Sequence, residues 1–231
     1  MILKIKVDTA VVMRRLNRFV VKADYFGKSL RLYLRNTGRL SDLLQPGSAA
    51  LFIRDKGPRT DGLLVGIAID DKRVAILDTG LQTVIFEESW RRGLIPWLEG
   101  WRIAKREYRY YDSRIDYLIV KGEAKGLLEV KSAVYHLGDY YCMYPDTISI
   151  RGRRHIERLI QARRRNYHAF LVFIAAHPSC RYFRPCREAD PVIGEILRKA
   201  RDSGVNIYSV KMYLTIDGEA ILDSSSIPVL I

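Results

Sequence analysis

One stretch decides the fold: RIDYLIVKGEAKGLLEVKSA, residues 114–133. It reads as two strands joined by a turn, because apolar residues flank the Gly-containing segment KGEAKG on both sides. Three charged residues, Asp116, Glu129 and Lys131, stand inside these strands. Glu129 and Lys131 are two positions apart, so their side chains leave the same face of a strand. Charges inside a half-buried hairpin require an explanation.

The register of the hairpin determines whether the three charges meet. With the turn centred on positions 123–124, Asp116 lies opposite Lys131 and on the same face as Glu129. A slip of one residue would move Asp116 to the other face. Two explanations then remain open. Asp116 and Lys131 form a surface ion pair across the strands, worth a few tenths of a kcal/mol, or the two carboxylates bind a divalent cation.

The second explanation has a chemical consequence. Mg²⁺ and similar hard cations prefer oxygen ligands, so two carboxylates on adjacent strands suit Mg²⁺ or Mn²⁺. A neighbouring lysine can orient a water or hold a phosphate oxygen, while the cation acidifies the water. The spacing Asp-x12-Glu-x-Lys therefore predicts metal-dependent phosphodiester hydrolysis. Glu107, in the preceding candidate strand, is a third candidate ligand, and Glu87 or Glu88 is a further one.

The charge balance points to a polyanionic partner. The 231 residues carry a formal net charge of +13 and the pI is near 9.7. Such a basic chain favours DNA or RNA as partner; the alternative is the arginine-rich surface of a thermophile protein. No apolar run reaches the roughly 18 residues that span a bilayer, and the N-terminal residues lack the core of a signal peptide. We expect a cytoplasmic protein.

The three cysteines, Cys142, Cys180 and Cys186, carry little functional signal. An odd number without a repeated CxxC excludes a disulfide framework and a four-cysteine zinc site. We expect reduced thiols; if a disulfide forms, Cys180 and Cys186 are the expected pair.

Composition divides the chain near residue 80. Residues 1–80 contain 15 Lys and Arg, eight Asp and no Glu. Short strands separated by turn sequences predict a small OB-like β-barrel, which would bind nucleic acid along a basic groove. The alternative is a β-domain with only a structural role. The expected strands are 11–25, 28–36, 48–56, 62–70 and 73–78.

Residues 81–231 alternate between helical and strand patterns. Strands followed by crossover helices indicate an α/β domain with a mixed sheet. The expected helices are 81–94, an arginine-rich helix over 151–168, and 191–204 with Asp190 as its cap; the expected strands outside the hairpin are 101–111, 169–176 and 205–216, with a Gly/Tyr/Pro-rich loop over 136–147.

The arginine-rich helix is expected to face both the sheet and a ligand. Ile156, Leu159 and Ile160 form its apolar face. On another face, side chains at i, i+4, i+7 and i+11 form a stripe suited to phosphates: Arg154, Arg158, Gln161 and Arg165. His155 is a candidate phosphate donor or general acid. The alternative for the stripe is a solvated charged face.

Several motifs together resemble the sugar fermentation stimulation protein A (SfsA) family. They are Asn36-Thr37-Gly38 in LRNTGRL, SRIDYLI, LEVKS, and YPDTISIRGRRHIERL after a Gly/Tyr loop, and the resemblance covers nearly the whole chain. It implies an OB-like domain followed by a nuclease domain of the PD-(D/E)XK, restriction-endonuclease-like fold. In that fold the catalytic residues match Asp116, Glu129 and Lys131. The nuclease signature is degenerate here, because Ile115 precedes Asp116 where proline is usual.

The resemblance implies DNA binding and a DNA/RNA nuclease activity. We assign catalysis to the hairpin charges and His155, and nucleic-acid contacts to the remaining candidates: Arg151, Arg154, Arg158, Arg165, Asn36 and Arg39. The alternative function is a non-catalytic DNA-binding regulator of sugar metabolism genes, built on a nuclease-like fold. It predicts salt-dependent binding without cleavage products.

Overall fold

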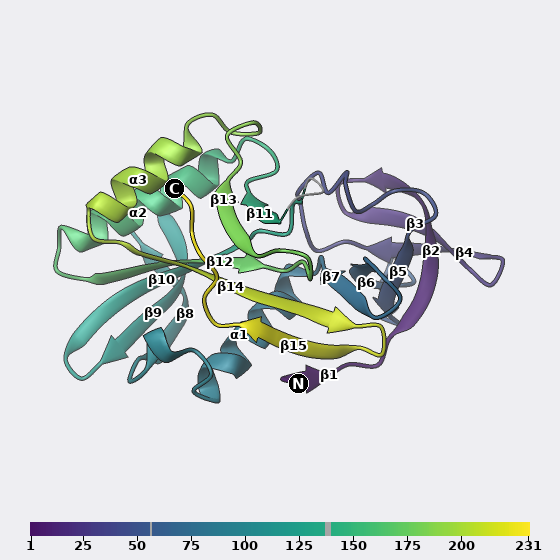
Figure 1. Ribbon diagram of the computed structural model, residues 1–231, viewed down its shortest axis with the longest axis horizontal. Helices are drawn as coiled ribbons and strands as arrows, with labels where there is room; N and C mark the ends of the chain where they lie inside the picture. Colours follow the sequence, from purple (N-terminus) through teal and green to yellow (C-terminus); the bar gives the residue numbers. More distant parts are fainter. Residues whose placement is uncertain (56, 137–139) are drawn as a thin grey trace.

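The computed structural model describes residues 1–55, 57–136 and 140–231 (Figure 1). Residue 56, the end of the strand expected over 48–56, and residues 137–139 of the loop expected over 136–147 therefore fall outside the described residues. The N-terminal part is built from strands alone: β1 (Leu3–Lys4), β2 (Asp8–Asn17), β3 (Val20–Tyr25), β4 (Lys28–Tyr33), β5 (Ala49–Ile53), β6 (Gly62–Ala68) and β7 (Arg73–Ile76).

Five of these strands close into a barrel. They follow the order β4-β3-β2-β5-β6, and β4 pairs in parallel with β6 through Leu32 and Gly62, which closes the ring. Gly62 is required at this crossing, because a Cβ there would lie 2.7 Å from the Ile53 carbonyl oxygen. The predicted barrel is confirmed, although its strands differ from those expected. Segment 11–25 is two strands, because Arg18 and Phe19 form a turn between β2 and β3.

The rest of the chain forms a mixed sheet with helices on both faces. Its elements are α1 (Thr79–Arg91), a short 3-10 helix (Pro96–Leu98), β8 (Arg102–Tyr110), β9 (Ser113–Lys121), β10 (Ala124–Ser132), β11 (Tyr141–Tyr144), α2 (Ile150–Arg163), β12 (His168–Ala175), β13 (Tyr182–Pro185), α3 (Ile193–Asp202), β14 (Asn206–Thr215) and β15 (Glu219–Ser224). The sheet order β8-β9-β10-β12-β14 joins an antiparallel hairpin to three parallel strands, with α2 and α3 as the crossovers. This confirms the predicted mixed α/β fold.

The barrel and the mixed sheet share hydrogen bonds. β7 pairs with β6 in the barrel and also with β14, so the sheet is continuous across residue 80 (Figure 1). The first strand, β1, pairs with β15 near the other end of the chain. One large apolar core accordingly contains side chains from both parts, including Phe52 of the barrel and Phe86 of α1. A second core, which includes Leu159 and Phe173, lies beneath α2 and α3.

The helices begin and end close to the expected positions, for identifiable reasons. Asp78 caps α1 by accepting a hydrogen bond from the Leu81 backbone N–H, and Ser149 caps α2 by accepting one from Gly152. The arginine-rich helix ends at Arg163, earlier than expected, so Arg165 lies beyond it. Asp190 was expected to cap α3, and this is wrong. Its buried carboxylate instead binds the guanidinium of Arg153.

The hairpin that decides the fold has a different register from the one expected. Lys121 pairs with Ala124 across a two-residue turn, so Leu127 faces Leu118 and Leu128 faces Tyr117. The expected register, with Asp116 opposite Lys131, is therefore wrong by two residues. The physical reason is Gly122, whose φ of 56° suits the first position of a tight hairpin turn. A shift of two residues preserves the faces, so the prediction that Asp116 and Glu129 share a face is unaffected.

The expectation for the cysteines is corrected. Cys142 and Cys180, 38 residues apart, form a disulfide with a Cα–Cα distance of 5.5 Å. Cys186 is the buried free thiol. Parallel pairing of β11 with β13 brings the first two cysteines together, and this pairing of short distant strands is not visible in the cysteine spacing.

No helix in residues 1–55, 57–136 and 140–231 is long and apolar enough to cross a membrane.

A buried histidine makes stability depend on pH. His177 is 3% exposed, its Nδ1 accepts a hydrogen bond from the Ser179 backbone N–H, and its ring stacks on His136. Burial lowers the pKa of His177 to about 3, and the charges of Lys211 and Arg73 act in the same direction. Between the usual pKa of 6.5 and this value, the unfolded chain binds a proton that the folded chain does not. Stability must fall as the pH falls through this window.

We expect wild type to lose about 2 kcal/mol more unfolding free energy than His177→Asn between about pH 7.5 and about pH 5. Asparagine keeps an acceptor for the Ser179 N–H but does not titrate. Chemical denaturation at both pH values measures the difference, with the exposed His168→Asn as the matched control. Parallel loss of stability in wild type and His177→Asn would contradict the assignment.

Candidate functional site

The two hairpin carboxylates meet where β9 and β10 stop pairing. Beyond Leu128, the strands separate and each carboxylate bonds to the backbone of the opposite strand. Asp116 Oδ2 accepts a hydrogen bond from the Val130 N–H at 2.7 Å, and Glu129 Oε2 accepts one from the Asp116 N–H at 3.2 Å. The two carboxylates therefore accept hydrogen bonds from backbone N–H groups where the pairing between the two strands has ended.

Glu129 is the centre of the cluster. It is 1% exposed, and its Oε1 ion-pairs with Lys131 Nζ and lies 2.5 Å from His155 Nδ1. His155 reaches it from the first turns of α2, where Arg151 Nε donates a hydrogen bond to His155 Nε2 at 3.4 Å. Because Nε2 accepts, the ring proton belongs on Nδ1, and His155 donates to Glu129. The structure thus brings together Asp116, Glu129, Lys131 and His155, the four residues to which the sequence analysis assigns catalysis.

Burial and neighbouring charges shift the pKa values of the two carboxyl groups in opposite directions. Burial, followed by the neighbouring Glu129 carboxylate, raises the pKa of Asp116 to about 7. Burial also opposes ionisation of Glu129, but Lys131 and His155 outweigh it and lower the pKa of Glu129. Burial would lower the pKa of Lys131, but the Glu129 carboxylate raises it. Lys131 is therefore a fixed positive charge, and Asp116 is the carboxyl that titrates near neutral pH.

The donor set fits a hard divalent cation. The pKa of Asp116 is raised first by burial and then by repulsion from the Glu129 carboxylate. A cation between the two carboxylates would relieve this repulsion, and oxygen is the ligand atom that Mg²⁺ and Mn²⁺ prefer. Asp116 and Lys131 line a hollow of about 290 Å³, closed on its other side by Arg35 and by Thr79 and Gly80 of α1. Asp116 and Glu129 are the residues that would hold the ion.

The other acidic candidates bind partners outside this cluster. Glu107 is well exposed on β8 and ion-pairs with Arg114. Glu87 binds Arg106 and the Tyr117 hydroxyl, while Glu88 binds arginines on its own helix. Each of these three carboxylates thus already has a partner elsewhere.

The predicted basic stripe is divided by its contacts. Arg151 and Arg154 are exposed near the start of α2, and Arg151 is the one that contacts His155. Arg158 forms a two-pronged ion pair with Asp112, at 2.7 and 2.9 Å, and contacts Gln161. Arg165 lies past the helix end with its guanidinium over the Tyr111 ring. Of these four arginines, Arg158 is the one that ion-pairs with an acidic side chain among the described residues.

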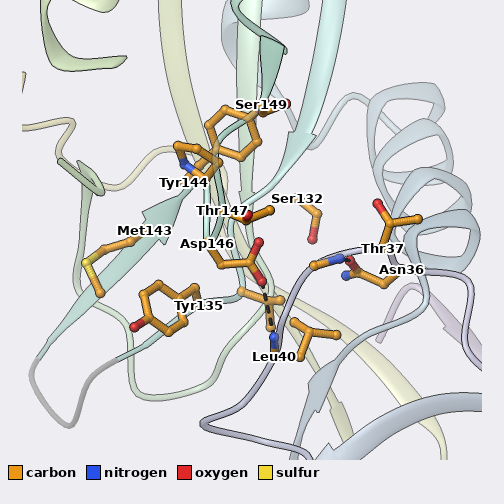
Figure 2. A pocket seen from close by; sticks show the side chains of 13 residues that line it. Asn36, Thr37, Leu40, Ser132, Tyr135, Met143, Tyr144, Asp146, Thr147 and Ser149 are labelled. Carbon is orange, nitrogen blue, oxygen red and sulfur yellow. Dashed lines mark hydrogen bonds between the residues drawn. The ribbon is translucent and has the colours of Figure 1, made fainter. Parts of the chain in front are cut away.

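The two other family motifs meet at a small cavity (Figure 2). About 150 Å³ lies between the loop after β4 and the segment around Asp146, whose carboxylate accepts a hydrogen bond from the Leu40 N–H at 3.2 Å. Gly38 lies against this carboxylate, because a Cβ at position 38 would lie 2.3 Å from Asp146 Oδ2. Asn36 has a structural role: its side chain donates to the Leu77 carbonyl and accepts from the Gly38 N–H. Arg39 is exposed, next to this cavity in the sequence.

Sequence reasoning missed Arg35. Its guanidinium binds the fully buried Asp78 carboxylate through Nε at 2.9 Å and Nη2 at 2.7 Å, so the barrel is tied to the cap of α1. It packs against Gly80, where a Cβ would lie 2.5 Å from the guanidinium carbon. A signal was present in KSLRLYLRN, because period-two alternation places Arg31, Tyr33 and Arg35 on one face.

The fold and the site together define a class of protein. Its members have an OB barrel joined through a shared sheet to an α/β domain, with an Asp-Glu-Lys cluster on a splayed hairpin. Family models agree: residues 13–76 match the SfsA N-terminal OB domain and residues 80–218 match the sugar fermentation stimulation protein RE domain. The chain belongs to the sugar fermentation stimulation protein (SfsA) family.

Individual relatives support this over nearly the full length. A sugar fermentation stimulation protein homolog of Pyrococcus furiosus is 39% identical over 211 residues, which is 91% of each chain. A homolog of Archaeoglobus fulgidus is 35% identical over 191 residues, covering 83% of this chain and 82% of the relative. The solved structure of Pyrococcus furiosus SfsA in complex with Ca²⁺ superposes with a TM-score of 0.94 at 37% identity, covering 100% of this chain and 99% of that one.

Proposed function

We propose that this protein hydrolyses phosphodiester bonds of nucleic acid with Mg²⁺ or Mn²⁺ held by Asp116 and Glu129. The observation that carries the proposal is the pair of carboxylates on the two strands of the splayed hairpin, Asp116 and Glu129, each bound to the backbone of the opposite strand, with Lys131 and His155 both bound to Glu129. The structure of Pyrococcus furiosus SfsA contains Ca²⁺, another cation that takes oxygen ligands, and this supports a hard cation here. The net charge of +13 supports DNA or RNA as the substrate.

Each residue then has a distinct task. A bound Mg²⁺ or Mn²⁺ would supply Lewis acidity toward a water and the phosphate oxygens. Lys131 stays protonated beside Glu129, so it would hold a phosphate oxygen or orient the attacking water and would not serve as the base. His155 fixes the Glu129 carboxylate through Nδ1 and is in turn oriented by Arg151. Arg151 and Arg154 would contact backbone phosphates next to the reacting one.

A nuclease assay tests the proposal directly. Single- and double-stranded DNA and RNA are incubated with wild type and Asp116→Asn in Mg²⁺, Mn²⁺ or EDTA. We expect wild type to cleave at least one of these substrates with Mg²⁺ or Mn²⁺, no cleavage in EDTA, and at least about 100-fold slower cleavage by Asp116→Asn, because the amide is a poor cation ligand. Bound but intact nucleic acid under all conditions would contradict hydrolysis and favour the non-catalytic DNA-binding regulator. Equal cleavage by both proteins would place the activity elsewhere.

A further inference from the structure

The outer face of β4 carries basic and aromatic side chains, whereas its inner face is apolar. Leu32 and Leu34 point into the barrel core and are fully buried. Arg31, Tyr33 and Arg35 lie between and beyond them, exposed on the opposite face. An aromatic ring between two guanidinium groups is a pattern suited to a ligand that has both flat apolar faces and negative charges.

A second exposed ring, Phe19, comes from the turn that adjoins the end of β4. Phe19 occupies the turn between β2 and β3, and its carbonyl oxygen accepts a hydrogen bond from the N–H of Leu34, the residue after Tyr33. Phe19 is 45% exposed and Tyr33 is 39% exposed. Both rings are thus partly exposed on the same side of the barrel, although burial of a large apolar side chain is favourable.

Both rings line one hollow on the barrel. It has a volume of about 860 Å³ and extends to the loop before β6, where Pro58 and Arg59 form its far side. Its charged lining consists of three arginines, Arg31, Arg35 and Arg59, against Asp55. Among the residues that the structure describes, the side chains of Arg31 and Arg59 form no ion pair. The lining therefore combines exposed rings with uncompensated positive charge.

Arg35 connects this hollow to the carboxylate site. It lines the hollow on the barrel and also the smaller one that contains Asp116 and Lys131. Asp78 holds the Arg35 guanidinium in place at this junction. A ligand that follows the barrel face from Phe19 past Arg35 would therefore arrive at the residues proposed to hydrolyse it.

We propose that the hollow with Phe19 and Tyr33 binds unpaired nucleotides of a single-stranded DNA or RNA substrate, and that the strand continues past Arg35 into the carboxylate site. Bases offer their flat faces to protein rings only when they are unpaired and unstacked, whereas Arg31 and Arg59 can contact the backbone of the same strand. This inference rests on the proposed function for its second part. It adds the substrate class: single strands, or duplexes with single-stranded overhangs.

The test measures binding without catalysis. Fluorescence anisotropy in EDTA follows a labelled single strand of about 20 nucleotides, its blunt duplex, and the same duplex with a single-stranded overhang. We expect wild type to bind the single strand at least about 10-fold more tightly than the blunt duplex. The double variant Phe19→Ala/Tyr33→Ala should bind the single strand at least about 30-fold more weakly, since stacking contributes about 1–3 kcal/mol per base. Both rings are exposed, so folding should be retained, and circular dichroism checks this.

Phe26→Ala is the matched control, because Phe26 is 87% exposed on the same barrel and does not line the hollow. It should bind like wild type. Equal affinity of the double variant and wild type, or blunt duplex bound as tightly as single strand, would overturn the proposal. Cleavage assays with Mn²⁺ separate it from the proposed function. Weakened binding by the double variant with no cleavage by any protein would uphold the strand-binding surface and reject hydrolysis. Cleavage that is lost in Asp116→Asn but unchanged in the double variant would uphold hydrolysis and reject the strand-binding surface.

Discussion

Nucleic-acid cleavage by Glu129→Gln is expected to fall at least about 1000-fold, the largest effect of any substitution considered. Oε1 of Glu129 is shared by Lys131 and His155, while Oε2 accepts from the Asp116 N–H. An amide has one acceptor oxygen, so one side of this network meets an NH₂ group that cannot accept. The substitution also removes a carboxylate from the proposed cation site and the partner that holds Lys131 in place, effects that together reach this order.

Binding separates a chemical effect from a structural one. Affinity for nucleic acid in EDTA should stay within about threefold of wild type, since removal of a buried negative charge does not weaken phosphate contacts elsewhere. Glu107→Gln is the control: the same change on an exposed carboxylate that pairs with Arg114 should leave the cleavage rate unaltered. Cleavage by Glu129→Gln at the wild-type rate would exclude the hairpin as the active site.

Arg35→Met is expected to lower the free energy of unfolding by about 2–3 kcal/mol, the largest effect on stability considered. It leaves the Asp78 carboxylate, which is fully buried, without its charged partner. Loss of one member of a fully buried pair costs about 3–5 kcal/mol. The expected cost is smaller here, because Arg35 is half-exposed and Asp78 keeps its hydrogen bond from the Leu81 N–H. Methionine preserves most of the aliphatic packing over Gly80.

Guanidinium-induced unfolding measures this cost. The matched control is Arg91→Met, which removes an exposed arginine that pairs with Glu88 on the surface of α1. Surface ion pairs contribute little, and Arg92 continues to bind the same carboxylate, so Arg91→Met should be close to neutral. Similar losses in the two variants would mean that Asp78 does not depend on Arg35.

The site was predictable from the sequence to the extent that it depends on local periodicity. Asp116, Glu129 and Lys131 lie within one hairpin, and a period of two assigns their faces without any long-range information. The exact pairing was not predictable in the same way, because it depends on which residues form the turn. Gly122 takes a positive φ, so the observed turn lies one position earlier than the expected turn, and the strand pairing differs from the expected pairing by two residues.

Contacts between distant segments were beyond the reach of the sequence patterns. Arg35 and Asp78 are 43 residues apart, and each stands in an ordinary strand or turn context. Gly38 and Asp146 belong to different motifs that meet only because the loop after β4 folds back onto the other part of the chain. Likewise, the length of α2 was overestimated, since arginines fit a helix or a loop equally well and the chain must turn to enter β12.

The shared sheet has a consequence for how this chain is divided. The two family models leave a gap at residues 77–79, an apparent place to separate the barrel from the α/β part. A cut there would remove β7 from β14 and β1 from β15, and so convert interior ladders into unprotected edges. Open edges of this kind invite pairing with other molecules. Two family models match the sequence separately, whereas the backbone hydrogen bonds of the sheet run without interruption from one part to the other.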